Sequence, residues 1–240
     1  RSYARQLIIK NIALEGQKRI NATYILCIGA GGLSSPILLY LAACGIGTIG
    51  IIDHDNIEIS NLQRQILYKN NDVNQLKTRT AYSALKSLNP LINIRIYQQK
   101  LDLNNINFIL TPYDIIIDGT DNLYTRYILS QYCYQLHKIH IYGAIEQFIG
   151  HISVFNYKSG INYYDLYNNI TKNYLNKCDN VGIVNTIAGI VGILQATEAI
   201  KIATGIGSII NGYLLIFNIL YCSLSKIKIK SKRITTQEIG

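Results

Sequence analysis

Apolar runs and polar segments alternate along this chain in a pattern that is typical of strands separated by helices. Short, nearly continuous apolar runs predict buried strands at 24–29, 48–53, 113–121 and 139–144, and an alternating segment predicts another at 93–98. Longer segments with helical spacing predict helices at 33–44, 76–89 and 123–136. Because strands that alternate with helices form parallel sheets covered on both faces, the first 150 residues predict a Rossmann-like, doubly wound α/β fold.

The pattern changes after Gly150. The following residues predict a strand at 151–157, a polar loop at 158–180, a long apolar helix at 183–203, and strands near 212–218 and 221–229. We expect these last strands to join the sheet antiparallel, which gives a mixed sheet with a parallel N-terminal part. No internal repeat or linker divides the chain, so residues 1–240 predict a single domain.

One uncharged segment, 202–225, is long enough to cross a bilayer. Three glycines and two asparagines interrupt it, and they favour a turn followed by a buried strand. We therefore expect no membrane partner.

Composition narrows the function classes. Hydrophobic residues make up 49% of the chain and charged residues 15%, which excludes a disordered protein. The net charge is +9, but the lysines are scattered except in 226–233 and no aromatic residues are interleaved with them, so we expect no nucleic-acid partner. The bias toward Ile, Asn, Lys and Tyr is typical of an AT-rich genome and predicts a plastid stroma or a bacterial cytoplasm. Five cysteines without a C-x-x-C pair argue against a disulfide framework and a four-cysteine zinc site.

The candidate chemistry begins at "GAGGLS" (29–34), which lies between a predicted strand and a predicted helix. Glycines there let the backbone approach a phosphate, and the free N–H groups of the first helical turn attract anions. Asp53 ends the next strand, where a carboxylate can bind ribose hydroxyls. The alternative that Asp53 only caps a turn stays open.

Charged residues also lie near the carboxyl ends of the predicted strands, at the same edge of the sheet as the glycine loop. Arg64 and Lys77 lie near the carboxyl ends of strands, and "DGTDN" (118–122) places Asp121 and Asn122 at another strand end. Two cations beside a glycine loop suit a triphosphate, and Asp121 is a candidate Mg²⁺ ligand. A nicotinamide dehydrogenase is a weaker interpretation, since no motif pairs a catalytic histidine with a carboxylate; His54 is the nearest candidate.

Several of these segments resemble the ThiF/MoeB family, the bacterial relatives of ubiquitin-activating enzymes. They are "GAGGLSSPILLYLAACGIGTIGIIDHDNIEISNLQRQIL", "RSYARQLI", "DGTDN", "GHISVFNY" and "GILQATEAIK", and together they span nearly the whole chain. The likeness is greatest to the molybdopterin-synthase branch. It implies ATP-dependent adenylylation of the C-terminal glycine carboxylate of a ubiquitin-like sulfur carrier that ends in Gly-Gly, with release of pyrophosphate.

The resemblance also implies residue roles. The nucleotide would be bound by Gly29, Gly31, Gly32, Asp53 (ribose), Ser60, Asn61, Leu62, Gln63, Arg64, Lys77, Asp121 (Mg²⁺) and Asn122. Within this set Asn61, Arg64 and Lys77 would contact phosphates. Arg5 would serve the active site of the neighbouring subunit, which implies a homodimer. Cys178 stands where relatives use a thiol in later sulfur or thioester steps, and an inert structural thiol is the open alternative.

The chain departs from the family pattern in the glycine loop, in the zinc-binding cysteines and in "NQLK" (74–77), where relatives often have a Gly-x-Pro-Lys arrangement. Ser34 replaces the usual third glycine of the loop. Asn162 and Asp165 stand where the first zinc-binding cysteine pair would be, and the second pair is missing, so we expect no zinc. The last residues, 234–240, resemble the opening of a rhodanese-like domain, so a further domain could begin near 234.

Three alternatives to this function stay open. The carrier could serve thiamine synthesis, or the chain could be an ATP-dependent tRNA-modifying dehydratase. It could also be a non-catalytic scaffold homologue, although the retained Arg64, Lys77 and Asp121 speak against that.

Overall fold

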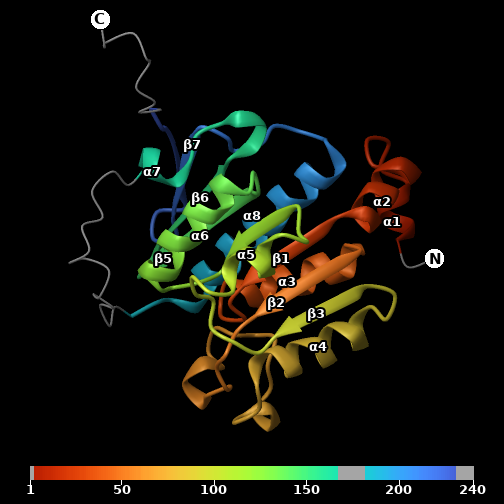
Figure 1. Ribbon diagram of the computed structural model, residues 1–240, viewed down its shortest axis with the longest axis vertical. Helices are drawn as coiled ribbons and strands as arrows, with labels where there is room; N and C mark the ends of the chain where they lie inside the picture. Colours follow the sequence, from red (N-terminus) through yellow and green to blue (C-terminus); the bar gives the residue numbers. More distant parts are fainter. Residues whose placement is uncertain (1–2, 167–181, 231–240) are drawn as a thin grey trace, which may run out of the picture.

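A computed structural model describes residues 3–166 and 182–230. Its centre is one eight-stranded sheet in the order β3-β2-β1-β4-β5-β6-β7-β8 (Figure 1). The strands are β1 (Tyr24–Ile28), β2 (Thr48–Ile52), β3 (Asn93–Tyr97), β4 (Ile115–Asp118), β5 (Ile139–Glu146), β6 (Ile149–Phe155), β7 (Tyr213–Asn218) and β8 (Ser223–Lys228). The pairs from β3 to β5 are parallel and those from β5 to β8 are antiparallel, which confirms the predicted mixed, Rossmann-like sheet.

The register of the parallel strands brings the predicted site segments together. Ile28 pairs with Ile52 on one side and with Asp118 on the other. The residues that follow these strand ends, Gly29, Asp53 and Gly119, therefore leave the sheet side by side at its carboxyl edge.

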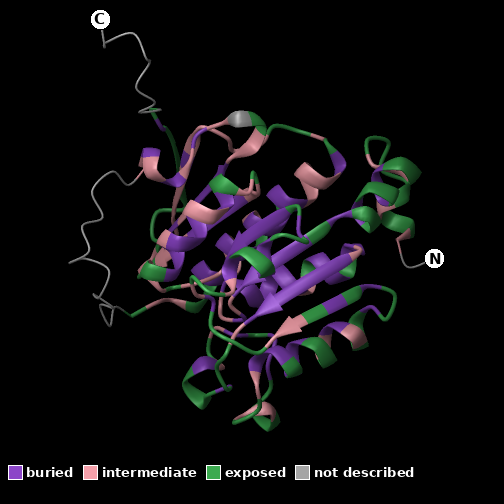
Figure 2. Cartoon of the chain, viewed as in Figure 1, coloured by how far each residue is buried: buried purple, intermediate pink, exposed green. Residues whose placement is uncertain are grey.

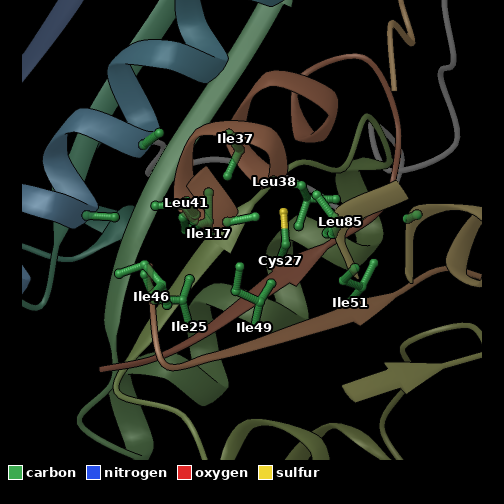
Figure 3. Packing of buried hydrophobic residues seen from close by; sticks show 14 of the residues in the cluster. Ile25, Cys27, Ile37, Leu38, Leu41, Ile46, Ile49, Ile51, Leu85 and Ile117 are labelled. Carbon is green, nitrogen blue, oxygen red and sulfur yellow. The ribbon is translucent and has the colours of Figure 1, made fainter. Parts of the chain in front are cut away.

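Helices cover both faces of the parallel strands. On one face lie α3 (Ser34–Cys44), α4 (Lys77–Leu88) and α8 (Asn185–Thr204), and on the other lie α5 (Ile106–Leu110) and α6 (Leu123–Gln135). Because both faces are covered, β2 and β4 are buried at every position, as the purple centre of Figure 2 shows. Isoleucines and leucines of β1, β2, β4 and α3 form the larger core around Cys27 (Figure 3).

Helix α8 lies against the antiparallel part of the sheet, close to β5 and β6. A Cβ atom on Gly143 would lie 2.5 Å from the Gln195 side chain, and one on Gly150 would lie 2.3 Å from Val191, so these glycines permit the close approach. By length and composition α8 is also the one helix among the described residues that could cross a membrane. Its Gln195 and Glu198 are buried in the protein, as in a core helix. The segment 202–225 forms the end of α8, a loop, β7 and the start of β8, so the predicted turn and strand are present. The strand is less buried than expected, since Leu214 is the one buried residue of β7.

Some predicted elements were wrong in detail. The strand expected at 113–121 ends at Asp118, because residues 119–122 turn away from the sheet. The described part of the expected loop 158–180 contains η3 (Tyr157–Ser159) and α7 (Tyr163–Leu166). The helices α1 (Ala4–Leu7), α2 (Ala13–Ala22) and α5 were not predicted, because their apolar patterns are short or weak. Two 3₁₀ turns, η1 (Ile59–Asn61) and η2 (Asn70–Asp72), lie between β2 and α4.

Candidate nucleotide-binding site

A cavity of about 410 Å³ opens at the carboxyl edge of the parallel strands. The loops that follow β1, β2, β3 and β4 line it, together with Ala144 and Ile145 of β5. This is the edge of an open α/β sheet at which ligands bind.

The glycine loop forms one wall of the cavity. Gly29 has a φ of +85°, and a Cβ atom there would lie 3.2 Å from the Gly119 carbonyl oxygen. Gly31 and Gly32 also line the cavity, beside the start of α3. Free N–H groups at a helix start favour an anion. Ser34, the replacement for the third family glycine, is fully buried and lies against Gly119 rather than lining the cavity.

Asp53 both holds this loop and lines the cavity. One of its carboxylate oxygens accepts the Ala30 N–H at 2.8 Å, and the other accepts the Asp55 N–H at 2.8 Å. Asp53 therefore does cap a turn, through the Asp55 N–H. Its ribose contact stays a prediction.

The two predicted cations meet at the cavity. Lys77 is the first residue of α4, and its ammonium lies 3.0 Å from the Asp55 carboxylate while its side chain is only 8% exposed. Arg64 donates from Nη1 to the Ser60 carbonyl oxygen at 3.2 Å. Both side chains line the cavity, so residues that are 13 positions apart converge on one space.

The four predicted residues that precede Arg64 do not line the cavity; they are Ser60, Asn61, Leu62 and Gln63. Asn61 is buried, and its side-chain oxygen accepts the Glu58 N–H at 3.2 Å, so it shapes the turn that carries Arg64. Gln65, which the predicted set omitted, does line the cavity. It is 3% exposed, and its Oε1 has no hydrogen-bond partner in the described part of the protein.

Asp121 and Asn122 also line the cavity. Asn122 accepts the Thr125 N–H at 2.9 Å through its side chain, and so caps the start of α6. Asp121 is exposed, and its carboxylate forms no hydrogen bond or ion pair within the described residues. An ionised carboxylate in such a position is a suitable ligand for a hard cation.

Sequence reasoning missed a buried ion pair next to these residues. The Arg126 Nε atom lies 3.1 Å from the Asp118 carboxylate, and neither side chain is more than 8% exposed. Arg126 also lines the cavity. An arginine within the apolar stretch of 123–136 was the signal that could have identified it.

Two further features lie near the glycine loop and Asp53. The Tyr68 hydroxyl donates to the Ala30 carbonyl oxygen at 2.8 Å, and burial near Asp53 raises the pKa of Tyr68 well above its ordinary value. The donor therefore stays protonated. The ligand atoms of Asp53, His54 and Asp55 lie within 4.8 Å of one another, so this side of the cavity also carries oxygen and nitrogen donors that could hold a metal.

Arg5 does not line the cavity, and two other predicted features fall outside the described residues. Arg5 is exposed on α1, and α1 contacts the ends of α3 and α4 at the amino edge of the sheet, since Gln6 donates to the Cys44 carbonyl and Tyr3 accepts from Asn89. Figure 1 shows α1 and α2 at that end, and no residue of either helix lines the cavity. Cys178 and residues 234–240 lie outside the described residues.

The replacements for the zinc-binding cysteines bond to each other. The Asn162 N–H donates to Asp165 Oδ2 at 2.8 Å, and the Asp165 N–H donates to Asn162 Oδ1 at 3.1 Å. This reciprocal pair caps α7, where the family would place metal ligands. The absence of zinc stays a prediction.

The sequence signature of the ThiF family matches residues 3–237. The chain belongs to the ThiF family. It is 48% identical over 232 residues to a probable molybdopterin-synthase adenylyltransferase of Gracilaria tenuistipitata var. liui, and this match covers 97% of the chain and 65% of the relative. A protein of Porphyra purpurea with the same name is 51% identical over 229 residues, with 95% and 60% covered. The ThiF-family chain thus spans less than two thirds of the length of these curated relatives.

Solved structures support the fold of this ThiF-family chain. Escherichia coli MccB with ATP superposes with a TM-score of 0.87 at 18% identity, over 98% of this chain and 74% of MccB. A structure of PaaA superposes with a TM-score of 0.81 at 19% identity, over 95% of this chain and 72% of that protein. The predicted family and fold class are therefore confirmed.

Proposed function

We propose that this ThiF-family chain is an adenylyltransferase that uses ATP to adenylylate the C-terminal glycine carboxylate of a ubiquitin-like sulfur carrier, of the type that serves molybdopterin synthase. The observation that supports this most is the convergence of Arg64, Lys77, Asp121 and the glycine loop on one cavity. Relatives that carry the name molybdopterin-synthase adenylyltransferase support the choice of carrier.

The chemistry would give the cations that line the cavity a role. A carrier carboxylate oxygen would attack the α-phosphorus of ATP, and the bond from that phosphorus to the pyrophosphate oxygen would break. The nucleophile is already ionised near neutral pH, so no base is needed. Because one anion must approach another, Arg64 and Lys77 would act by neutralising charge on the triphosphate before and during attack.

Other residues of the chain would bind and orient. The N–H groups of the glycine loop and the start of α3 would face phosphate, and Asp53 would accept from ribose hydroxyls. The Asp121 carboxylate fits a hard cation because it is exposed to the cavity and is unpaired within the described residues, with Asp55 also present there. When bound there, Mg²⁺ would supply further neutralisation of phosphate charge.

The first test is carrier-dependent exchange of pyrophosphate into ATP. Arg64→Ala should keep the fold and lower the exchange rate by roughly 10²–10³, by analogy with the loss of one transition-state donor. Arg79→Ala removes an exposed arginine that does not line the cavity, and it should exchange like the wild type. Unchanged exchange in Arg64→Ala would contradict the proposal.

The same assay separates the alternatives. Exchange that needs a Gly-Gly-ended carrier supports adenylylation, and comparing molybdopterin-type with thiamine-type carriers identifies the carrier. ATP consumption stimulated by tRNA would instead support the dehydratase, and failure to bind ATP would support the scaffold homologue.

We also propose a homodimer with shared sites. Arg5 lies at the amino edge of the sheet while the cavity lies at the carboxyl edge, so Arg5 can serve a cavity only in a partner chain. Arg5→Ala and Arg64→Ala variants should each be inactive, and mixing them should restore part of the activity, because a mixed dimer carries one intact site. No recovery after subunit exchange would contradict sharing. We further propose a plastid stroma or a bacterial cytoplasm as the setting, and the relatives from Gracilaria and Porphyra support the plastid.

A further inference from the structure

Thr120 is the residue through which the protein holds the wall of the cavity that carries Asp121. Its backbone N–H donates to Asp118 Oδ1 at 3.0 Å, and its carbonyl oxygen accepts from Arg126 Nη2. Its hydroxyl oxygen accepts the Asn122 N–H at 3.1 Å. Every polar group of Thr120 is therefore bonded, and the loop has little freedom on either side of Asp121.

Arg126 connects this loop to its surroundings. Besides its contacts with Asp118 and Thr120, Nη2 donates to the Gly143 carbonyl oxygen of β5 at 3.2 Å. The guanidinium lies 5.1 Å from the centre of the Tyr142 ring. One side chain thus bridges the end of β4, the 119–122 loop and β5, which line the cavity from two sides.

The fixed end of the loop is itself buried. Asp118 is fully buried, and its carbonyl oxygen accepts from Gln195 of α8 at 2.8 Å. The Asp118 carboxylate also lies 3.7 Å from His140 Nε2. A buried ion pair with several such contacts resists rearrangement, because removing one partner leaves an uncompensated charge.

Asp121 depends on this arrangement because it has no contact of its own. Within the described residues its carboxylate has no hydrogen bond or ion pair, so only the backbone at Thr120 and Asn122 sets where it points. A functional ligand must be held to within about 0.5 Å by supporting residues.

We propose that Arg126 is a positioning residue for Asp121, acting through the Thr120 carbonyl, so that its loss weakens divalent-cation binding more than it weakens folding. This inference rests on the proposed function only in assigning Asp121 to the cation. Lysine is the informative substitution, because it keeps a charge for Asp118 but lacks the planar group that reaches two carbonyls at once.

Two measurements test it. Mn²⁺ is titrated into the protein in the presence of a non-hydrolysable ATP analogue, with binding followed by electron paramagnetic resonance. Arg126→Lys should weaken Mn²⁺ binding by about 10–100-fold, the usual loss when a support of a metal ligand is removed. Independently, hydrogen exchange of the Thr120 and Asn122 amides should become faster, since their bonds loosen.

Matched variants keep the test decisive. Arg95→Lys changes an exposed arginine of β3 that does not line the cavity, and it should leave Mn²⁺ affinity unchanged. If Arg126→Lys does not fold, Thr120→Ala removes the acceptor for the Asn122 N–H and should weaken Mn²⁺ binding, whereas Thr120→Ser retains it and should not. Adding Arg126→Lys to Asp121→Asn should cause no further loss, because Arg126 acts through Asp121.

The outcomes separate this inference from the proposed function. Normal Mn²⁺ binding and normal amide exchange in a folded Arg126→Lys protein would overturn the positioning role alone. Additive losses in the double variant would show that Arg126 acts independently of Asp121 and would also overturn it. If the wild type binds neither the ATP analogue nor Mn²⁺, the proposed function and this inference both fail.

Discussion

The parallel and antiparallel parts of the one sheet differ sharply in burial, although both are rich in isoleucine and leucine. Strand β2 is buried at all five positions, whereas β8 is exposed at all six. The parallel strands have helices on both faces, while β8 is an edge strand with one neighbour. Strand β8 also has two serines and two lysines among its six residues, so its composition and its edge position both favour exposure. The covered strands end in the loops of the cavity, so the most rigid part of the sheet carries the groups that must be held in place.

The same substitution, isoleucine to alanine, should lower the free energy of unfolding more in the parallel part than in the antiparallel part. Ile117 of β4 is fully buried in the larger core (Figure 3), and Ile117→Ala should lower the free energy of unfolding by about 2–5 kcal/mol, the usual cost of a cavity in a packed core. Ile227 of β8 is 50% exposed, and Ile227→Ala should change it by no more than about 0.5 kcal/mol. Urea denaturation of both variants gives the comparison.

The control for this pair is the slope of each unfolding curve. If both slopes match the wild type, the midpoints report stability directly. A loss in Ile227→Ala as large as that in Ile117→Ala would mean that β8 is covered in solution, and the contrast between the two parts would be lost.

Raising the pH should have a smaller effect on stability, through the Cys27 thiol of the parallel strand β1. Burial raises the pKa of the Cys27 thiol from 9.0 to about 12. Between these values the unfolded chain has released a proton that the folded chain keeps, so stability should fall as pH rises above 9. The fall should be at most about 1.4 kcal/mol per pH unit for one thiol.

Comparing the wild type with Cys27→Ala isolates this thiol, because other buried acids contribute equally to both proteins. The variant should lose stability less steeply between pH 9 and pH 10 in urea titrations. Identical slopes in the two proteins would contradict the assignment of the alkaline loss to Cys27.

The same contrast explains what the sequence could predict of the fold. Buried parallel strands appear as continuous apolar runs, so β1 and β2 were located to within one residue. Strand β4 was predicted too long at its carboxyl end. The chain turns out of the sheet after Asp118, where the Thr120 N–H bonds to the Asp118 side chain, and the apolar pattern does not show that turn. Short helices such as α1 were missed because four residues carry too little periodicity to be distinguished from a loop.

Placement of residues at the cavity from the sequence worked where a residue lies near a strand end. Gly29, Asp53 and Asp121, which come after β1, β2 and β4, line the cavity, and so do Arg64 and Lys77, while the roles of all five stay predictions. It failed where the direction of a side chain depends on distant neighbours. Nothing local distinguishes Gln63 from Gln65, yet only Gln65 is buried at the cavity. Arg126 could be interpreted only once Asp118 and Gly143 lay beside it.

The ion pair between Lys77 and Asp55 affects which anions can bind in the cavity. Any anion that approaches Lys77 must compete with a carboxylate already 3.0 Å away and tethered to the same protein. A singly charged ion gains little by displacing it, since it replaces one negative charge with another. A species with several linked negative charges could bind Arg64 and the loop amides at the same time, so the proposed function predicts that the cavity prefers polyanions to the monovalent salts around it.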